Sequence, residues 1–312
     1  MEFRQDVHLG MTRALTPPLG NGGGCCKTVA DVRELSRSLA GAIVLGSITR
    51  EARLGNAGDV WWVGQGAALN SLGMPNGGSN YLKRHLREMV EIAHDAGKAL
   101  VVNVAGFHPK EYAELTAQAL ELGADAVEEN LGCPNILDDG ERKPIFAFDL
   151  EAIDEIISLI ERQAGASAPI WLKVSPHSDP SLLRKSADVI ARHEAVKAVT
   201  AINTFPNAYG LDDAGRPVIS AGLAGLSGRA LKHIGLGQIK QWREWLPDRI
   251  RLIAVGGISS GTDVRDYGRA GAEAFQVTTE LLKRGQLDPQ PFEQIALEFD
   301  ALDTLPSAPS KS

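Results

Sequence analysis

The stretch that decides the fold is ALVVNVAGFHPKEYAELTAQALELGADAVEENLG, residues 99–132. Its first part, ALVVNVAG (99–106), is a near-continuous apolar and β-branched run, as expected for a strand buried on both faces. EYAELTAQALEL (111–122) repeats its apolar residues at close to 3.6-residue spacing, which predicts an amphipathic helix. A second predicted strand, AVEENLG (126–132), follows. Strand, helix and strand in this order predict a β-α-β unit with parallel strands.

The same alternation recurs along the chain. Further helices are predicted at 31–40, 149–163, 178–193 and 261–271, and Asp149 and Pro180 are start signals for two of them. Eight strands favour a closed (β/α)8 TIM barrel, although the pattern alone also allows an open doubly wound sheet. We therefore predict an α/β fold with a single domain over residues 1–302. The six strands predicted in addition are 17–24, which is Gly-rich and weak, 41–47, 169–176, 198–205, 251–258 and 274–281.

Two segments, 50–80 and 206–228, are too long for simple connections, and both are rich in Gly and Asn. Each follows a predicted strand, and the loops that follow barrel strands lie on the catalytic face. We therefore predict that both are inserted active-site loops. The Pro- and Ser-rich tail, residues 303–312, is expected to be disordered.

The composition excludes several classes of function. The chain has 312 residues, 44% hydrophobic residues and a net charge of −7, so no basic excess suggests nucleic acid or an anionic membrane. No window approaches the roughly 18 apolar residues of a membrane span, and the first ten residues lack the apolar core of a secretory signal. Cys25, Cys26 and Cys133 form no disulfide framework, which indicates a cytoplasmic protein. The seven histidines are scattered, so no metal is expected.

Glycine clusters follow two of the predicted strands. Gly256-Gly257 comes after the seventh strand, where barrels often bind a phosphate at a helix N-terminus, although a plain turn also fits. Thr278-Thr279 is predicted within the eighth strand, beside this position. GLAGLSG (222–228) is a second glycine cluster, and its spacing alone favours a flexible loop over a nucleotide site.

Several polar residues stand where chemistry is expected. Lys173 interrupts the apolar strand IWLKVSP, so it is expected to meet either a ligand or a structural acid. Cys133 follows a strand end, where it is either a small buried hydrophobe or a base or nucleophile, while Cys25-Cys26 is expected to be structural. Four asparagines are each compatible with a turn, but together they would suit a planar ring with alternating N–H and C=O groups: Asn70, Asn130, Asn135 and Asn203.

Two of these segments carry a family resemblance. EENLGCPN (128–135) resembles the strand and catalytic loop of the soluble, class 1 dihydroorotate dehydrogenases, and NSLGMPN (70–76) resembles their substrate-loop motif. The resemblance covers residues from about 17 to 285. Lys143-Pro144 resembles the fumarate-reducing, homodimeric branch, which needs no iron–sulfur partner. Supporting matches in the family's order are GSIT (46–49), Leu172-Lys173, Asn203-Thr204, GLAGLSG and AVGGISSG (254–261).

The resemblance implies an FMN-binding (β/α)8 barrel that oxidises dihydroorotate to orotate in pyrimidine biosynthesis. A loop cysteine, matched by Cys133, takes the C5 proton while hydride passes to flavin N5. The implied partners are dihydroorotate and a soluble electron acceptor, expected to be fumarate, within a cytoplasmic homodimer. The implied substrate-binding residues are Asn70, Met74, Asn130, Asn135, Asn203 and Thr204. The implied cofactor-binding residues are Gly22, Gly23, Ser47, Asn103, Asn130, Lys173, Asn203, Gly228, Gly256, Gly257, Thr278 and Thr279.

The chain departs from the family's pattern at three positions. Gly46 stands where the family has a lysine that contacts flavin and substrate, so a cation for the orotate carboxylate is missing. Glu129 stands where the family prefers an apolar residue, and Thr278 replaces a glycine of the phosphate strand. The first departure keeps open an FMN enzyme for another reduced pyrimidine or cyclic amide. From a different class, a non-redox barrel that binds a phosphate ligand also stays open.

Overall fold

In the computed structural model, which describes residues 6–303 except 65, 139, 140, 144 and 284, eight parallel strands close a barrel. The strand order around the barrel is β1-β14-β13-β10-β9-β6-β5-β2, so the open doubly wound sheet is excluded and all eight predicted strands are confirmed. Their bounds are β1 (Leu19–Asn21), β2 (Ala42–Ile48), β5 (Ala99–Val104), β6 (Ala126–Asn130), β9 (Ile170–Val174), β10 (Val196–Ala201), β13 (Arg251–Val255) and β14 (Ala274–Val277).

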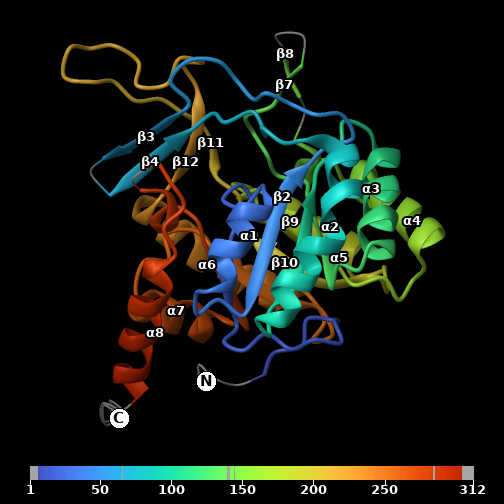
Figure 1. Ribbon diagram of the computed structural model, residues 1–312. Coiled ribbons are helices and arrows are strands. Elements are labelled where there is room, and N and C mark those ends of the chain that lie inside the picture. The colour runs from blue at the N-terminus through green and yellow to red at the C-terminus, as the bar shows by residue number, and fades with distance from the viewer. Residues whose placement is uncertain (1–5, 65, 139–140, 144, 284, 304–312) are drawn as a thin grey trace.

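Helices cover the outside of the barrel (Figure 1). The predicted start signals are confirmed, because Asp149 accepts a hydrogen bond from the Ala152 N–H and Pro180 occupies the first turn of its helix. The sequence pattern did not assign α2, α6 or α8, and the first of these begins without a side-chain cap. The helices are α1 (Val29–Ser36), α2 (Gly78–Asp95), α3 (Pro109–Glu121), α4 (Leu150–Ala164), α5 (Pro180–Ile190), α6 (Lys232–Trp245), α7 (Gly261–Ala270) and α8 (Gln290–Asp303).

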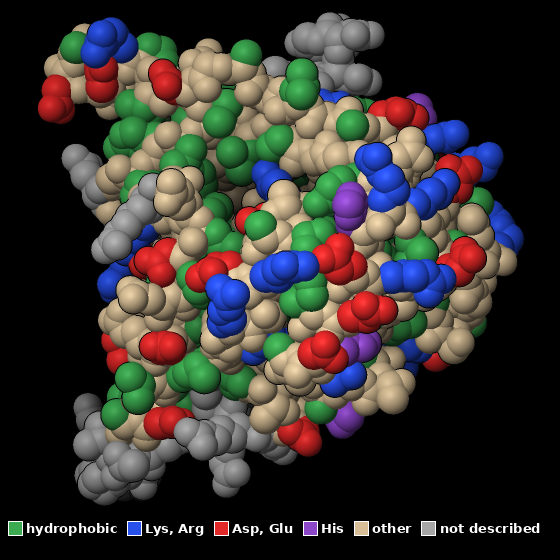
Figure 2. Space-filling model, viewed as in Figure 1, with side chains coloured by type: hydrophobic (Ala, Val, Ile, Leu, Met, Phe, Trp, Pro, Cys, Tyr) green, Lys and Arg blue, Asp and Glu red, His purple; other side chains and the backbone are tan. Residues whose placement is uncertain are grey.

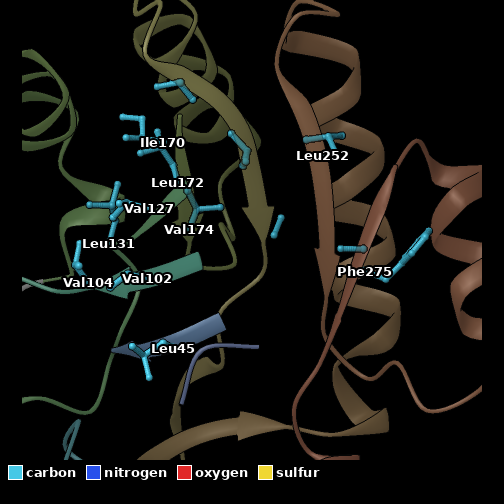
Figure 3. Close-up of a cluster of buried hydrophobic side chains, with 14 of the residues drawn as sticks. Leu45, Val102, Val104, Val127, Leu131, Ile170, Leu172, Val174, Leu252 and Phe275 are labelled. Carbon is cyan, nitrogen blue, oxygen red and sulfur yellow. The ribbon is translucent and has the colours of Figure 1, made fainter. Parts of the chain in front are cut away.

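The barrel strands separate two kinds of packing. Their outward side chains join one large apolar cluster with the helices, to which β2, β5, β6, β9, β13 and β14 all contribute (Figure 3). Inside, an apolar cluster that includes Leu9, Val101 and Trp171 closes one end of the barrel. A buried polar layer occupies the interior above it: Asn21, Asn103, Glu128, Lys173, Thr200 and Gln276. This alternation is the period of two that a strand imposes on its side chains.

The prediction that 50–80 and 206–228 are inserted loops is partly wrong, because both segments contain strands. β3 (Trp61–Gly64), β4 (Ala67–Asn70), β11 (Phe205–Ala208) and β12 (Ala224–Ser227) form a four-stranded antiparallel sheet in the order β11-β12-β4-β3. Each strand has only four residues, and the two halves of the sheet come from distant parts of the chain. No local period could therefore reveal the pairing.

Smaller differences concern the ends of elements. Thr278 and Thr279 follow β14 rather than lying within it, because the ladder with β13 ends at Gln276. A short hairpin, β7 (Leu137–Asp138) with β8 (Glu141–Arg142), extends the loop after β6. Three short 3-10 helices complete the described fold: η1 (Phe146–Phe148), η2 (Arg229–Leu231) and η3 (Glu280–Leu282). Pro144 and the tail from residue 304 onward, of which disorder was predicted, lie outside the described residues. Among the described helices, none is long and apolar enough for a membrane span.

Candidate active site

A pocket opens at the carboxyl ends of the barrel strands, under the small sheet. Its empty space is about 1080 Å3, including the open mouth, which is ample for a cofactor and a small substrate. The structure brings most of the predicted site residues together in its lining: Gly23, Ser47, Asn70, Met74, Asn130, Cys133, Asn135, Lys173, Asn203, Thr204, Gly228, Gly256, Gly257, Thr278 and Thr279.

Gly22 and Asn103 lie just behind this lining. A Cβ on Gly22 would lie 2.2 Å from the Thr278 hydroxyl, so the glycine allows that side chain to pack closely. Asn103 is fully buried beneath the pocket, where its Nδ2 donates to Glu128 at 2.7 Å. Its Oδ1 has no hydrogen-bond partner among the described residues.

Three strand ends are joined across the pocket by side chains. Asn130, at the end of β6, donates from Nδ2 to the Ser47 hydroxyl of β2 at 2.9 Å. Its Oδ1 accepts from Asn203 Nδ2, just after β10, also at 2.9 Å. The backbone oxygen of Asn130 is held from behind by the Tyr112 hydroxyl at 2.9 Å. These bonds engage both the nitrogen and the oxygen of the Asn130 side-chain amide, so its orientation at the strand end is fixed.

A second polar group joins the loop after β6 to the small sheet. Asn135 Nδ2 donates to the backbone oxygen of Asn70 at 2.8 Å and to its side-chain oxygen at 3.1 Å. The Asn135 Oδ1 and the Thr204 hydroxyl are buried and have no partner within the described chain. Gly225 makes this grouping possible, since a Cβ there would lie 2.2 Å from the Thr204 hydroxyl. Buried orphan groups in a pocket indicate a polar ligand that completes them.

Cys133 lies in the loop after β6, packed against an apolar group with Met74, Phe107 and Ile136. Burial raises the pKa of the Cys133 thiol above its usual value. Influences that lower the pKa oppose this shift, namely a hydrogen bond from the Asn135 backbone and the charges of Lys143, Lys173 and Arg53. The thiol is therefore partly buried with cations nearby, which suits a group that gains and loses a proton.

Lys173 reaches the pocket from the buried polar layer, and the structural acid that the sequence analysis allowed for it is Glu128. It lines the pocket, and its Nζ also lies 3.8 Å from Glu128 Oε1 and 3.4 Å from Gln276 Oε1. Glu128 is fully buried and accepts further bonds from Thr200 at 2.8 Å and from Gln276 Nε2 at 2.7 Å. A cation at the pocket floor is thus tied to a fixed carboxylate.

The other end of the pocket offers a cradle for an anion. Gly228, with φ +79°, lies directly before η2 and α6, so backbone N–H groups of a helix start face this region. Gly257, with φ +73°, comes so close that a Cβ there would lie 2.9 Å from the Gly228 oxygen. The Thr279 and Ser227 hydroxyls are 3.2 Å apart beside them. Glycine backbone and hydroxyls form a donor set that fits a phosphate.

Gly46, where the resemblance leads us to expect a lysine, has a backbone that only glycine adopts easily. Its φ is +124°, and a Cβ would lie 2.2 Å from the Asn103 backbone oxygen. Hydrogen bonds to Cys26 and from Gly24 pin it on both sides. The local backbone therefore requires glycine at position 46. A lysine there would need a change in the backbone as well as in the side chain.

Sequence reasoning missed several residues of this site. Glu128 was quoted only as part of a motif, although the strand period places it and Glu129 on opposite faces of β6. Trp61 lines the pocket from β3, directly opposite Asn70 in the ladder, but no local signal marks it because its strand lies in an insertion. Other lining residues that were not assigned are Lys27, Ser227, Gln276 and Glu280. Among the described residues, no group of three potential metal ligands occurs.

Comparison with known proteins identifies the family. The family model for dihydroorotate dehydrogenase matches residues 11–301. The chain belongs to the dihydroorotate dehydrogenase family. The match spans nearly the whole barrel. It therefore includes every lining residue named above, both in the loop after β6 and in the glycine cradle around Gly228 and Gly257.

Individual members of the dihydroorotate dehydrogenase family agree over most of their length. Dihydroorotate dehydrogenase A (fumarate) of Lactococcus lactis is 28% identical over 91% of this chain and 90% of its own. The NAD(+)-type B catalytic subunit of Methanopyrus kandleri is 32% identical over 83% of this chain and 78% of its own. A crystal structure of the Eimeria tenella DHODH with ferulenol matches with a TM-score of 0.77 at 20% identity, covering 97% of this chain and 86% of that one. The last comparison bears on the fold alone.

Proposed function

We propose that this protein is an FMN-dependent oxidoreductase that oxidises (S)-dihydroorotate to orotate in pyrimidine biosynthesis. One observation carries the proposal: the Cys133 thiol shares a pocket with four asparagines in a member of the dihydroorotate dehydrogenase family. The described barrel is proposed to act as one FMN-binding domain.

The donor set of the pocket fits FMN. Gly228, Gly256, Gly257 and Thr279 would hold the phosphate, with Thr278 beside them. Lys173, Asn130 and Asn203, which line the same pocket, would hold the flavin ring. The residues proposed to complete the cofactor site are Gly22, Gly23, Ser47 and Asn103. When bound, FMN supplies the hydride acceptor, and the protein supplies orientation and electrostatics.

Cys133 is proposed as the base that removes the C5 proton of the substrate. In this role the thiolate form is active, so deprotonation must be attainable within the pocket. Burial works against the thiolate, while the charges of Lys143 and Arg53 favour it. The rate of proton removal should therefore increase with pH until the thiol is fully deprotonated.

The asparagines are proposed to bind the substrate ring. A carboxamide offers one acceptor and two donors in a plane, which matches adjacent N–H and C=O groups of a dihydropyrimidine. The unpartnered Asn135 Oδ1 and Thr204 hydroxyl provide an acceptor and a donor for such groups. The full proposed set is Asn70, Met74, Asn130, Asn135, Asn203 and Thr204.

The electron acceptor is proposed to be soluble, with fumarate as first choice, because fumarate-type enzymes recur among the relatives. We also propose a cytoplasmic homodimer with no nucleic-acid or membrane partner. Hydrophobic side chains gather over the small sheet and the 206–223 loop in the upper left of Figure 2, where Figure 1 places these elements. Tyr209, Leu211 and Leu223 are among the exposed apolar residues of that region and are the proposed centre of the dimer contact.

A second candidate substrate follows from Gly46. Without a cation at this position, a neutral dihydropyrimidine or another cyclic amide loses less binding energy than the dihydroorotate carboxylate does. Turnover of dihydroorotate and dihydrouracil, each assayed with fumarate and with NAD+, separates the two candidates and the two acceptors. Preference for dihydrouracil would support this second candidate.

The cofactor is tested by the visible spectrum of the purified protein and by FMN titration of the stripped protein. We expect a flavin band and tight rebinding. A protein that stays colourless when FMN is added would overturn the proposal and favour a non-redox barrel that binds a phosphate ligand.

A further inference from the structure

The buried polar layer contains a carboxylate that the proposed chemistry does not use. Glu128 lies inside the barrel beneath the pocket and is 0% exposed. Four side chains surround it, each from a different strand: Asn103 from β5, Lys173 from β9, Thr200 from β10 and Gln276 from β14. A buried carboxylate is costly unless donors surround it, so this one has a position that the barrel itself determines.

Gln276 transmits that position to Lys173. Its Nε2 donates to Glu128 Oε2 at 2.7 Å, and this bond leaves its Oε1 as the acceptor for Lys173 Nζ at 3.4 Å. Among the described residues, the other acceptor recorded near Lys173 Nζ is Glu128 Oε1 at 3.8 Å. Both acceptors near the ammonium therefore depend on the same carboxylate, one directly and one through the amide.

We propose that Glu128 is a positioning residue, which holds the Lys173 ammonium at the pocket floor and so sets the electrostatic potential at the flavin ring. The inference rests on the proposed FMN site. A flexible lysine chain has many rotamers, and a fixed double acceptor selects the one that reaches the pocket. Glu128 itself acts through Lys173, and it lies outside the pocket lining.

The midpoint potential of the bound flavin distinguishes this role from that of a simple charge. Removing a negative charge near a flavin raises its potential, because the reduced ring carries more negative charge. Losing the placement of Lys173 has the opposite effect. In our proposal the placement of Lys173 has the larger effect of the two. We therefore expect Glu128→Gln to lower the potential in an otherwise native protein. In a Lys173→Met background the same change should raise the potential or leave it unchanged.

A rise of equal size in both backgrounds, or no change in either, would overturn the inference. Because Glu128→Gln places an amide among four donors, its folding is checked by FMN content and thermal unfolding. Thr200→Val is the milder second variant, and it should lower the potential by a smaller amount that vanishes in the Lys173→Met background.

Thr116→Val is the matched control for Thr200→Val. Thr116 also donates to a buried glutamate at 2.8 Å, but to Glu129 on the other face of β6. We expect its flavin potential to equal that of the wild type, and an equal shift in both threonine variants would contradict a specific role for Glu128. A wild-type protein that binds no FMN would instead overturn the proposed function, so the two failures are distinguishable.

Discussion

Glu128 and Glu129 are neighbours on β6 and both are fully buried, yet they lie on opposite faces of the strand. Glu128 faces the barrel interior, where four side chains from four strands surround its carboxylate. Glu129 faces α3, where the Thr116 hydroxyl is its one hydrogen-bond donor among the described residues, and its Oε2 is unpartnered. The alternation of side chains along β6 alone places one glutamate among donors beneath the pocket and the other where its carboxyl is only partly hydrogen-bonded.

The surroundings explain the difference. The outer face of β6 packs against the helices through apolar side chains such as Val127 and Leu131, so donors are scarce there. Desolvation by this burial raises the pKa of Glu129 to about 8, although the bond from Thr116 lowers it somewhat. An apolar residue would fit this position better, in line with the preference of the resembled family.

The largest expected effect is on turnover. Turnover should depend on residues of the inner face of β6 and of the loop that follows it, and not on the outer face. We expect Cys133→Ala to retain FMN but to lose about a thousandfold in turnover, the usual contribution of a general base. Glu129→Gln is the matched control on the outer face and should keep nearly full turnover. Full activity in Cys133→Ala would contradict the assignment of Cys133 as the base.

A stability measurement sharpens the comparison next. Glu128→Leu leaves several buried donors without an acceptor and should lower the free energy of unfolding by about 3–5 kcal/mol. Glu129→Leu removes an unsatisfied carboxyl, and Thr116 keeps its bond to the Tyr112 oxygen at 2.7 Å, so this change should be neutral or stabilising. Urea unfolding of both variants at one pH tests this, and equal losses would break the comparison.

The pH dependence of stability gives a third test of the comparison, because its effect builds up gradually across a range of pH. The pKa of Glu129 in the folded chain, about 8, is above the ordinary value of 4.5, so the folded state binds the extra proton between these pH values. Its contribution to stability is therefore lost progressively as pH rises from about 4.5 toward 8. Unfolding of wild type and Glu129→Gln from pH 5 to 9 should show the variant gaining relative stability until about pH 8. A constant difference would show that Glu129 does not titrate in this range.

The sequence predicted the parts of the molecule that local patterns encode. Apolar runs predicted seven of the eight barrel strands, and the Gly-rich first strand was inferred from the other seven. Motif residues such as Cys133 and Asn130 do line one pocket. The small sheet was missed because its pairing joins β4 to β12, some 155 residues apart, as at Asn70 and Gly225. Which face of β6 each glutamate takes is set by barrel closure, which no single segment contains.

The most direct test of the account is anaerobic mixing of the purified protein with dihydroorotate while the flavin band near ~450 nm is recorded. The account predicts rapid bleaching in the wild type, equal bleaching in Glu129→Gln and very slow bleaching in Cys133→Ala. A wild-type flavin band that stays unchanged with dihydroorotate would contradict it. Bleaching by dihydrouracil alone would show that the neutral dihydropyrimidine is the substrate.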